Sequence, residues 1–185
     1  MKKVVLVPLA SGFEEIEAVS IIDILRRAEI EVIIGYLEES NLILGANWIT
    51  IQADIPLKDI DVDKLDMIVL PGGWSGTKAL ASDPLTQEIL KQMDSKNKLI
   101  GAICAAPFAL HSAGVLKQNY TCYPSVENEI RVDGYQNDKV VVEDENILTS
   151  RGPATAICFA LEIVKKLCGE EKYLAIKKGL LATHC

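Results

Sequence analysis

The feature that most constrains the fold of this chain is a regular alternation of short apolar segments with amphipathic ones. The apolar segments have the length and composition of buried strands and cover residues 4–8, 31–36, 67–70, 99–103 and 147–149. The segments between them are longer and carry apolar residues at helical spacing. Such alternation predicts an α/β protein with a mainly parallel sheet and helices on both faces. The length of 185 residues predicts a single domain, residues 1–185.

The amphipathic segments give the expected helices. Residues 15–27 place Ile16, Val19, Ile22 and Leu25 on one stripe, which we expect to pack inward. Asp83 followed by Pro84 predicts a helix start, because Asp is a good N-cap and Pro suits the first helical position. Three further helices are expected at residues 106–112, 154–167 and 171–181. A β-hairpin is expected at residues 42–51, with strands 42–44 and 48–51, and one more strand at residues 140–142.

Charge and hydropathy exclude several classes of function. The net charge of −7 argues against binding to nucleic-acid phosphates or to anionic membranes. No apolar run approaches the ~20 residues that a membrane span needs. We therefore expect a cytoplasmic protein without nucleic-acid or membrane partners.

The five cysteines are an odd number and show no C-x-x-C spacing, which favours free thiols in a reducing compartment. Zinc is disfavoured, because the only closely spaced Cys/His pair is His184-Cys185 at the C-terminus. No metal and no cofactor are therefore expected.

Cys104 has the sequence context of a nucleophile. It follows a predicted buried strand, and the small residues Ala102 and Ala106 lie two positions before and after it, as a sharp strand-to-helix turn requires. The N-terminus of the following helix would favour the thiolate and lower the pKa of the thiol. The alternative is that Cys104 is a small buried apolar residue, the commonest role of a free cysteine.

Two other segments could complete a site around this thiol. Gly72-Gly73 follows another buried strand, and the N–H groups of Gly73 and Ala105 could stabilise an oxyanion. A simple turn is the alternative for the two glycines. Glu17 lies near the face expected to be buried, where a carboxyl beside a thiolate would be held protonated and could move a proton. A Cys–His pair is disfavoured, because His111 lies about two helical turns from Cys104.

These segments match a known family. The chain resembles the ThiJ/PfpI superfamily, in particular the branch of the Parkinson-disease-associated protein deglycase and its bacterial homologues. The resemblance covers nearly the whole chain and rests on four motifs in order: residues 12–18 (GFEEIEA), 69–73 (VLPGG), 102–107 (AICAAP) and 148–153 (LTSRGP).

The resemblance implies a flavodoxin-like three-layer sandwich, like that of class I glutamine amidotransferases, and a homodimer. It implies a catalytic or redox-sensing Cys104 with a protonated Glu17, and Gly73 and Ala105 as oxyanion donors. The pocket residues it implies are Gly72, Tyr123, Pro124, Arg151 and Pro153.

The chain departs from the family pattern at three positions. Tyr123 precedes Pro124 where many animal members carry His, and Asn47 stands where some members carry an Arg that reaches across the dimer. Ala105 stands where peptidase-like relatives carry His, which makes a cysteine peptidase the weaker interpretation.

Two hypotheses follow from the resemblance. The first is a cysteine-dependent enzyme that acts on reactive α-oxoaldehydes, as a glutathione-independent glyoxalase or a protein deglycase, with small aldehydes or glycated protein side chains as partners. The second is a redox-sensing protective protein or chaperone whose Cys104 is oxidised to a sulfinate. A binding protein with an inert thiol is a third, weaker alternative.

Overall fold

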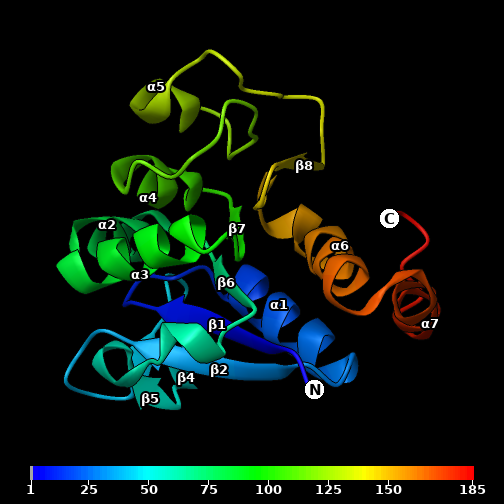
Figure 1. Cartoon of the computed structure of the whole chain (residues 1–185), viewed down its shortest axis with the longest axis horizontal. Helices are drawn as coiled ribbons and strands as arrows, with labels where there is room; N and C mark the ends of the chain where they lie inside the picture. The colour runs from blue at the N-terminus through cyan, green and yellow to red at the C-terminus, as the bar shows by residue number, and fades with distance from the viewer. Residues whose placement is uncertain (1) are drawn as a thin grey trace.

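The computed structural model describes residues 2–185, which form a seven-stranded sheet between two layers of helices (Figure 1). The strand order is β5-β2-β1-β6-β7-β9-β8, and only β8 runs antiparallel to its neighbour. The strands are β5 (Ile55–Pro56), β2 (Glu31–Tyr36), β1 (Val4–Leu9), β6 (Met67–Leu70), β7 (Leu99–Ile103), β9 (Ile147–Ser150) and β8 (Val141–Asp144). The α/β class and the mainly parallel sheet predicted from the sequence are confirmed.

The central strands are apolar on both faces because helices cover both. In β1, Val5, Val7 and Leu9 belong to the core on one side of the sheet, and Leu6 belongs to the core on the other side. Side chains of successive strand residues point to opposite faces, so one short apolar run supplies both cores.

Two groups of helices cover the sheet (Figure 1). One face carries α1 (Glu15–Arg27), α6 (Ala156–Cys168) and α7 (Glu170–Gly179). The other carries α2 (Trp74–Ser82), α3 (Pro84–Ser95) and α4 (Pro107–Ser112). The predicted start of α3 is confirmed, because the Asp83 carboxylate accepts a hydrogen bond from the Thr86 N–H at 2.6 Å.

Smaller elements complete the fold. The hairpin is formed by β3 (Leu42–Leu44) and β4 (Thr50–Gln52); β4 starts later than predicted because Trp48, with φ 68°, lies in the turn. The helix α2 and the short α5 (Glu127–Ile130) were not expected from the sequence. Three 3-10 turns are η1 (Leu57–Asp59), η2 (Val62–Lys64) and η3 (Pro153–Thr155).

The predicted buried stripe of α1 is wrong at two of its four positions. Ile22 and Leu25 are buried, but Ile16 is 59% exposed and Val19 is 48% exposed. The buried face also contains Ala18, Ile21 and Ile24, so the true stripe is rotated relative to the expected one. A single helix with apolar residues all round leaves this ambiguity, and only packing against α6 and the sheet decides it.

The expectation that every cysteine is a free thiol is also wrong. Cys158 and Cys185 form a disulfide, with their Cα atoms 5.2 Å apart, whereas Cys104, Cys122 and Cys168 are free. The disulfide joins the beginning of α6 to the end of the chain. Among residues 2–185, no helix combines the length and the apolar character needed to cross a membrane.

Candidate active site

The candidate site lies where three adjacent parallel strands end. The strands β1, β6 and β7 are neighbours in the sheet, so the loops after them meet at one edge. These loops bring together Glu17 of α1, the pair Gly72-Gly73, and Cys104. The three segments singled out in the sequence therefore form one site.

The backbone around Cys104 is held in a sharp turn. Cys104 has φ 63°, an uncommon conformation for a residue with a side chain. Its N–H donates to the Ser150 carbonyl at 3.0 Å, and its carbonyl accepts from the Tyr123 N–H at 2.9 Å. These two bonds come from separate segments, which explains why β9 and the loop at Tyr123 matter for the position of this thiol.

The site needs glycine at both positions after β6. A Cβ on Gly72 would lie 2.6 Å from the Cβ of Cys104 and 2.7 Å from Oε2 of Glu17. Gly73 has φ +87°, and a Cβ there would lie 2.3 Å from the Gly12 carbonyl oxygen. The simple-turn interpretation is therefore insufficient, because this loop packs directly against the cysteine and the carboxyl.

Glu17 is fully buried beside the thiol. Its Oε2 accepts a hydrogen bond from the Gly72 N–H at 2.7 Å. Its Oε1 is buried without a nitrogen or oxygen partner among residues 2–185, and the carboxyl also interacts with the Cys104 thiol. Burial raises the pKa of Glu17 to about 7, and the nearby Glu14 adds to this, although the bonds from Gly72 and Cys104 oppose it. The carboxyl is thus positioned to hold a proton next to sulfur.

The effect of this environment on Cys104 differs from the sequence prediction. Burial and the Glu17 carboxylate raise the pKa of the thiol, whereas the N–H groups of Gly73 and Ala105 lower it. We expected the helix N-terminus to lower the pKa, but α4 has only six residues and the thiol is only 9% exposed. Cys104 and Glu17 therefore titrate as a coupled pair. With one proton between them, either a thiolate beside a neutral carboxyl or a thiol beside a carboxylate avoids the repulsion of two anions.

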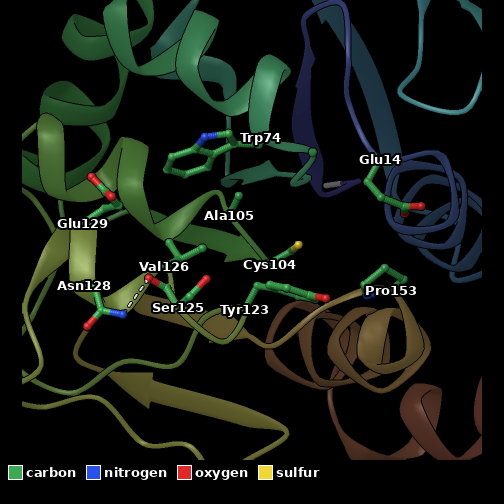
Figure 2. A pocket seen from close by; sticks show the side chains of 11 residues that line it. Glu14, Trp74, Cys104, Ala105, Tyr123, Ser125, Val126, Asn128, Glu129 and Pro153 are labelled. Carbon is green, nitrogen blue, oxygen red and sulfur yellow. Dashed lines mark hydrogen bonds between the residues drawn. The ribbon is translucent and has the colours of Figure 1, made fainter.

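A cavity of about 630 Å³ opens in front of the thiol. Figure 2 shows Cys104 between the Trp74 indole and the Tyr123 ring in this view. The lining residues are Glu14, Gly73, Trp74, Cys104, Ala105, Tyr123, Ser125, Val126, Asn128, Glu129 and Pro153.

The cavity contains only part of the pocket set inferred from the family motifs. Tyr123 and Pro153 line it, as expected. Gly72, Pro124 and Arg151 do not line it; Gly72 instead lies behind the thiol, in contact distance of Glu17. A motif shows that residues lie near the site, but the direction of each backbone segment decides which side chains face the cavity.

Comparison with known proteins identifies the family of this chain. Residues 2–166 match the model of the DJ-1/PfpI family. This chain belongs to the DJ-1/PfpI family. Protein dj-1beta of Drosophila melanogaster is 40% identical over 186 residues, with 100% of both chains covered. The glutathione-independent glyoxalase DJ-1 of Schizosaccharomyces pombe is 34% identical over 181 residues, covering 93% of this chain and 95% of that one.

The fold agrees with the same family. The crystal structure of Drosophila melanogaster DJ-1beta superposes with a TM-score of 0.94 at 41% identity, covering 98% of each chain. The flavodoxin-like fold and the ThiJ/PfpI resemblance predicted from the sequence are thereby confirmed.

Several residues that line the cavity of this DJ-1/PfpI protein were not predicted from the sequence. Trp74 begins α2 directly after Gly73, and its ring packs 5.3 Å from that of Phe108 between centroids. Its position next to the Gly-Gly pair was the one available signal. Glu14 caps α1, where its carboxylate accepts from the Glu17 N–H, and it also lines the cavity. The α5 region carries no motif, and only the fold brings Glu129 to the rim.

Neither histidine takes part in the site. His111 is exposed on α4, and no histidine is among the described residues that line the cavity. Three metal-ligating side chains do come together elsewhere, at Cys158, His184 and Cys185. Glu17 is the carboxyl that interacts with the Cys104 thiol.

Replacement of Gly72 by alanine tests the packing of the DJ-1/PfpI site. The added Cβ would force Cys104 or Glu17 to shift, because both lie under 3.0 Å from it. We expect an activity loss of about 100-fold and destabilisation of about 1–3 kcal/mol. The measurements are activity and urea unfolding. Gly179→Ala is the matched control, because nothing lies within 4 Å of its added Cβ; equal effects of both substitutions would contradict the packing argument.

The raised pKa of Glu17 predicts a pH-dependent stability. The folded chain keeps this proton up to about pH 7, whereas the unfolded chain loses it near its ordinary pKa of 4.5. The free energy of unfolding should therefore fall as the pH rises from 4.5 through 7, by about 3 kcal/mol. Glu17→Gln should remove this decrease.

Urea unfolding between pH 4.5 and 8 measures the effect. Glu31→Gln, which changes an exposed carboxyl at the start of β2, is the control and should keep the wild-type profile. Parallel stability profiles for the wild type and Glu17→Gln would rule out a buried proton at this carboxyl.

Proposed function

We propose that this DJ-1/PfpI protein is a cysteine-dependent enzyme that converts reactive α-oxoaldehydes to hydroxy acids without glutathione. The observation that carries the proposal is the contact of the Cys104 thiol with the buried carboxyl of Glu17, in front of two backbone N–H groups. They offer a nucleophile and oxyanion donors that line one cavity, and a proton carrier buried beside the thiol. The S. pombe relative, whose name states this activity, supports the proposal.

The reaction begins with the aldehyde carbon. The Cys104 thiolate attacks it, and the N–H groups of Gly73 and Ala105 stabilise the oxyanion as it forms. The neutral Glu17 then donates its proton to that oxygen, which gives a hemithioacetal and a carboxylate. Only the π bond of the aldehyde carbonyl is broken in this first step, and its electron pair becomes the oxyanion.

The second stage moves a proton between neighbouring carbons. The Glu17 carboxylate removes the proton from the former aldehyde carbon, and an enediolate forms with its charge on the former ketone oxygen. The hemithioacetal hydroxyl proton passes to that oxygen, and Glu17 returns its proton to the adjacent carbon, which gives a thioester of the hydroxy acid. Water then cleaves the thioester, releases the acid and restores the thiol. The sum is addition of one water to the α-oxoaldehyde, so no external oxidant or reductant is consumed.

The assay must separate catalysis from simple trapping of aldehyde by thiols. Methylglyoxal is supplied in large molar excess over protein, without glutathione, and lactate is measured by NMR. We expect many equivalents of lactate per chain. Aldehyde consumption that stops at about one equivalent, or lactate at the protein-free rate, would contradict an enzyme.

The cavity also bears on a deglycase activity. About 630 Å³ is far more space than a three-carbon aldehyde fills, and the acidic residues Glu14 and Glu129 are among those that line it. Glycated lysine or arginine side chains would fit this acidic rim. Release of lactate from a methylglyoxal-treated peptide, at a rate above its spontaneous decay, is the result that this extension requires.

The second candidate is a redox sensor, and the buried Glu17 favours it. Two peroxide molecules would convert the Cys104 thiol to a sulfinate with release of two waters. A protonated Glu17 could donate a hydrogen bond to a sulfinate oxygen. Intact mass after mild peroxide should show two added oxygens at Cys104. If the wild type forms lactate but gains no oxygen, the redox-sensor hypothesis is eliminated and the enzyme hypothesis stands.

A homodimer is the assembly we propose for this chain. Exposed apolar side chains gather on α1 and on the β3–β4 hairpin: Ile16, Val19, Leu42, Leu44, Trp48 and Ile49. Glu15 of α1 links the two elements, because its carboxylate accepts hydrogen bonds from the Asn47 N–H at 2.5 Å and from Asn47 Nδ2 at 2.9 Å. Patches of this kind mark protein interfaces. Val19→Lys should convert a dimer to a monomer in sedimentation velocity, whereas Leu174→Lys on the exposed face of α7 should not.

A further inference from the structure

Three metal-ligating side chains meet at the C-terminal end of the chain. They are Cys158, in the first turn of α6, and His184 and Cys185. One ligand atom of each lies within 4.8 Å of the others. The sequence shows only the His184-Cys185 pair, because Cys158 is distant in the chain and joins the group through folding.

The tail is held in this place by contacts other than the disulfide. Gly169, with φ +88°, separates α6 from α7, and α7 packs beside α6 (Figure 1). After α7 the Ala182 N–H donates to the Lys177 carbonyl at 3.2 Å, and Ala182 is buried. These contacts keep the tail near the start of α6 when the disulfide is reduced.

A fourth ligand is available in the same cavity. The space of about 360 Å³ at this group is also lined by Glu143 and Glu162. Glu162 lies one helical turn after Cys158, on the same face of α6. The Glu143 carboxylate pairs with Lys166, whereas Glu162 forms no ion pair among residues 2–185. Glu162, or a water in its place, could complete four-coordination.

The redox state of the chain decides which chemistry this group can perform. Conditions that keep Cys104 as a working thiol are reducing, and they also reduce an ordinary disulfide. The group then offers two thiols and one imidazole, the donor types that select zinc over calcium or magnesium. Zinc bonds of about 2.3 Å to sulfur and 2.0–2.1 Å to nitrogen put neighbouring ligand atoms roughly 3.5–4 Å apart. Because the three ligand atoms already lie within 4.8 Å of one another, zinc binding needs only a small movement of the terminal residues.

We propose that Cys158, His184 and Cys185 form a redox-controlled zinc site, which holds Zn²⁺ in the reduced chain and loses it when the disulfide forms. Peroxide is the oxidant: one cysteine sulfur attacks it to give a sulfenic acid and one water, and the second sulfur displaces a second water as the S–S bond forms. Of the two thiolate electron pairs that bound zinc, one becomes the S–S bond and the other passes to peroxide, so the disulfide no longer offers thiolate ligands. The site shares no lining residue with the Cys104 cavity.

Metal titration of the full chain tests the site. Protein reduced with a phosphine and stripped with a chelator is titrated with Zn²⁺ against a chromophoric chelator. Co²⁺ serves as the optical probe, because thiolate ligation gives a charge-transfer band. We expect one equivalent to bind to the reduced wild type and to Cys104→Ser, and none to peroxide-treated wild type. Binding of two thiols should release protons, which a pH indicator detects.

Substitutions then locate the metal. Cys185→Ser and His184→Asn should each weaken binding by at least about tenfold, and both lie at the chain end, where the fold tolerates change. Cys168→Ser, which removes a free thiol outside the group, should bind like the wild type. Four results would each overturn the proposal. They are failure of the reduced wild type to bind Zn²⁺, full binding by Cys185→Ser, binding by the oxidised chain, and loss of binding in Cys104→Ser.

Discussion

Replacement of Cys104 by serine is expected to lower kcat/KM for methylglyoxal by on the order of 10³-fold or more, which corresponds to about 4 kcal/mol or more of lost transition-state stabilisation. Serine is nearly isosteric, so the turn, with its bonds to Ser150 and Tyr123, should persist. Its hydroxyl, however, stays protonated near neutral pH, and among residues 2–185 no histidine lines the cavity to remove that proton. The coupled pair, in which sulfur can become the anion, is therefore lost.

Cys168→Ser is the matched control for this experiment, since it removes a half-buried free thiol far from the cavity lining. It should retain wild-type kcat/KM. Circular dichroism and unfolding midpoints of both variants show whether the fold is kept. A folded Cys104→Ser protein with wild-type turnover would eliminate the thiol mechanism.

Replacement of Glu17 by glutamine is expected to cost about 10²- to 10⁴-fold in kcat, the usual contribution of a positioned general acid and base. The amide oxygen can still accept from the Gly72 N–H, so the geometry should be kept. The amide cannot carry a proton between the two substrate carbons. Cys104 should remain able to form the hemithioacetal, so trapping of one equivalent of aldehyde should survive while turnover stops.

The pH profile gives a second readout of the same substitution. The wild-type pair keeps both protons below about pH 7, because burial raises the pKa of Glu17 to about 7 and raises that of Cys104 as well. Activity of the wild type should therefore rise with pH through this region, where the pair loses its first proton. In Glu17→Gln the rise should follow the thiol alone. Glu31→Gln, at the exposed start of β2, should keep the wild-type pH profile; an unchanged profile in Glu17→Gln would exclude the coupled pair.

Much of the site follows from local sequence. The small residues Ala102 and Ala106 around Cys104, and the Gly-Gly pair after an apolar run, predict a thiol on a turn near backbone donors. Short-range sterics dictate these features, because a sharp strand-to-helix turn and a close backbone approach accept few residue types. The strands 31–36, 67–70 and 99–103 were predicted at their observed bounds because each is a short apolar run.

Glu17 shows how a sequence pattern can lead to the correct residue by an incorrect route. We placed it near the buried face because Ile16 and Val19 appeared to define that face, yet both are largely exposed. Glu17 is buried instead with Ala18, Ile21 and Ile24. Whether an apolar helix face packs against the protein's own core or lies open to a partner depends on distant elements, and local spacing does not contain that information.

The sequence alone determined the α/β class, the alternation of the longer strands and helices, and the candidate roles of Cys104, Gly73 and Ala105, because these depend on short-range patterning and turn chemistry. Tertiary structure decided the rest. It set the raised pKa of Cys104 through burial beside Glu17, formed the cavity with Trp74 and the α5 region, and brought Cys158 to the chain end. Each of these depends on contacts between residues far apart in the chain, and chain closure over such distances is specified by the whole core rather than by any one segment.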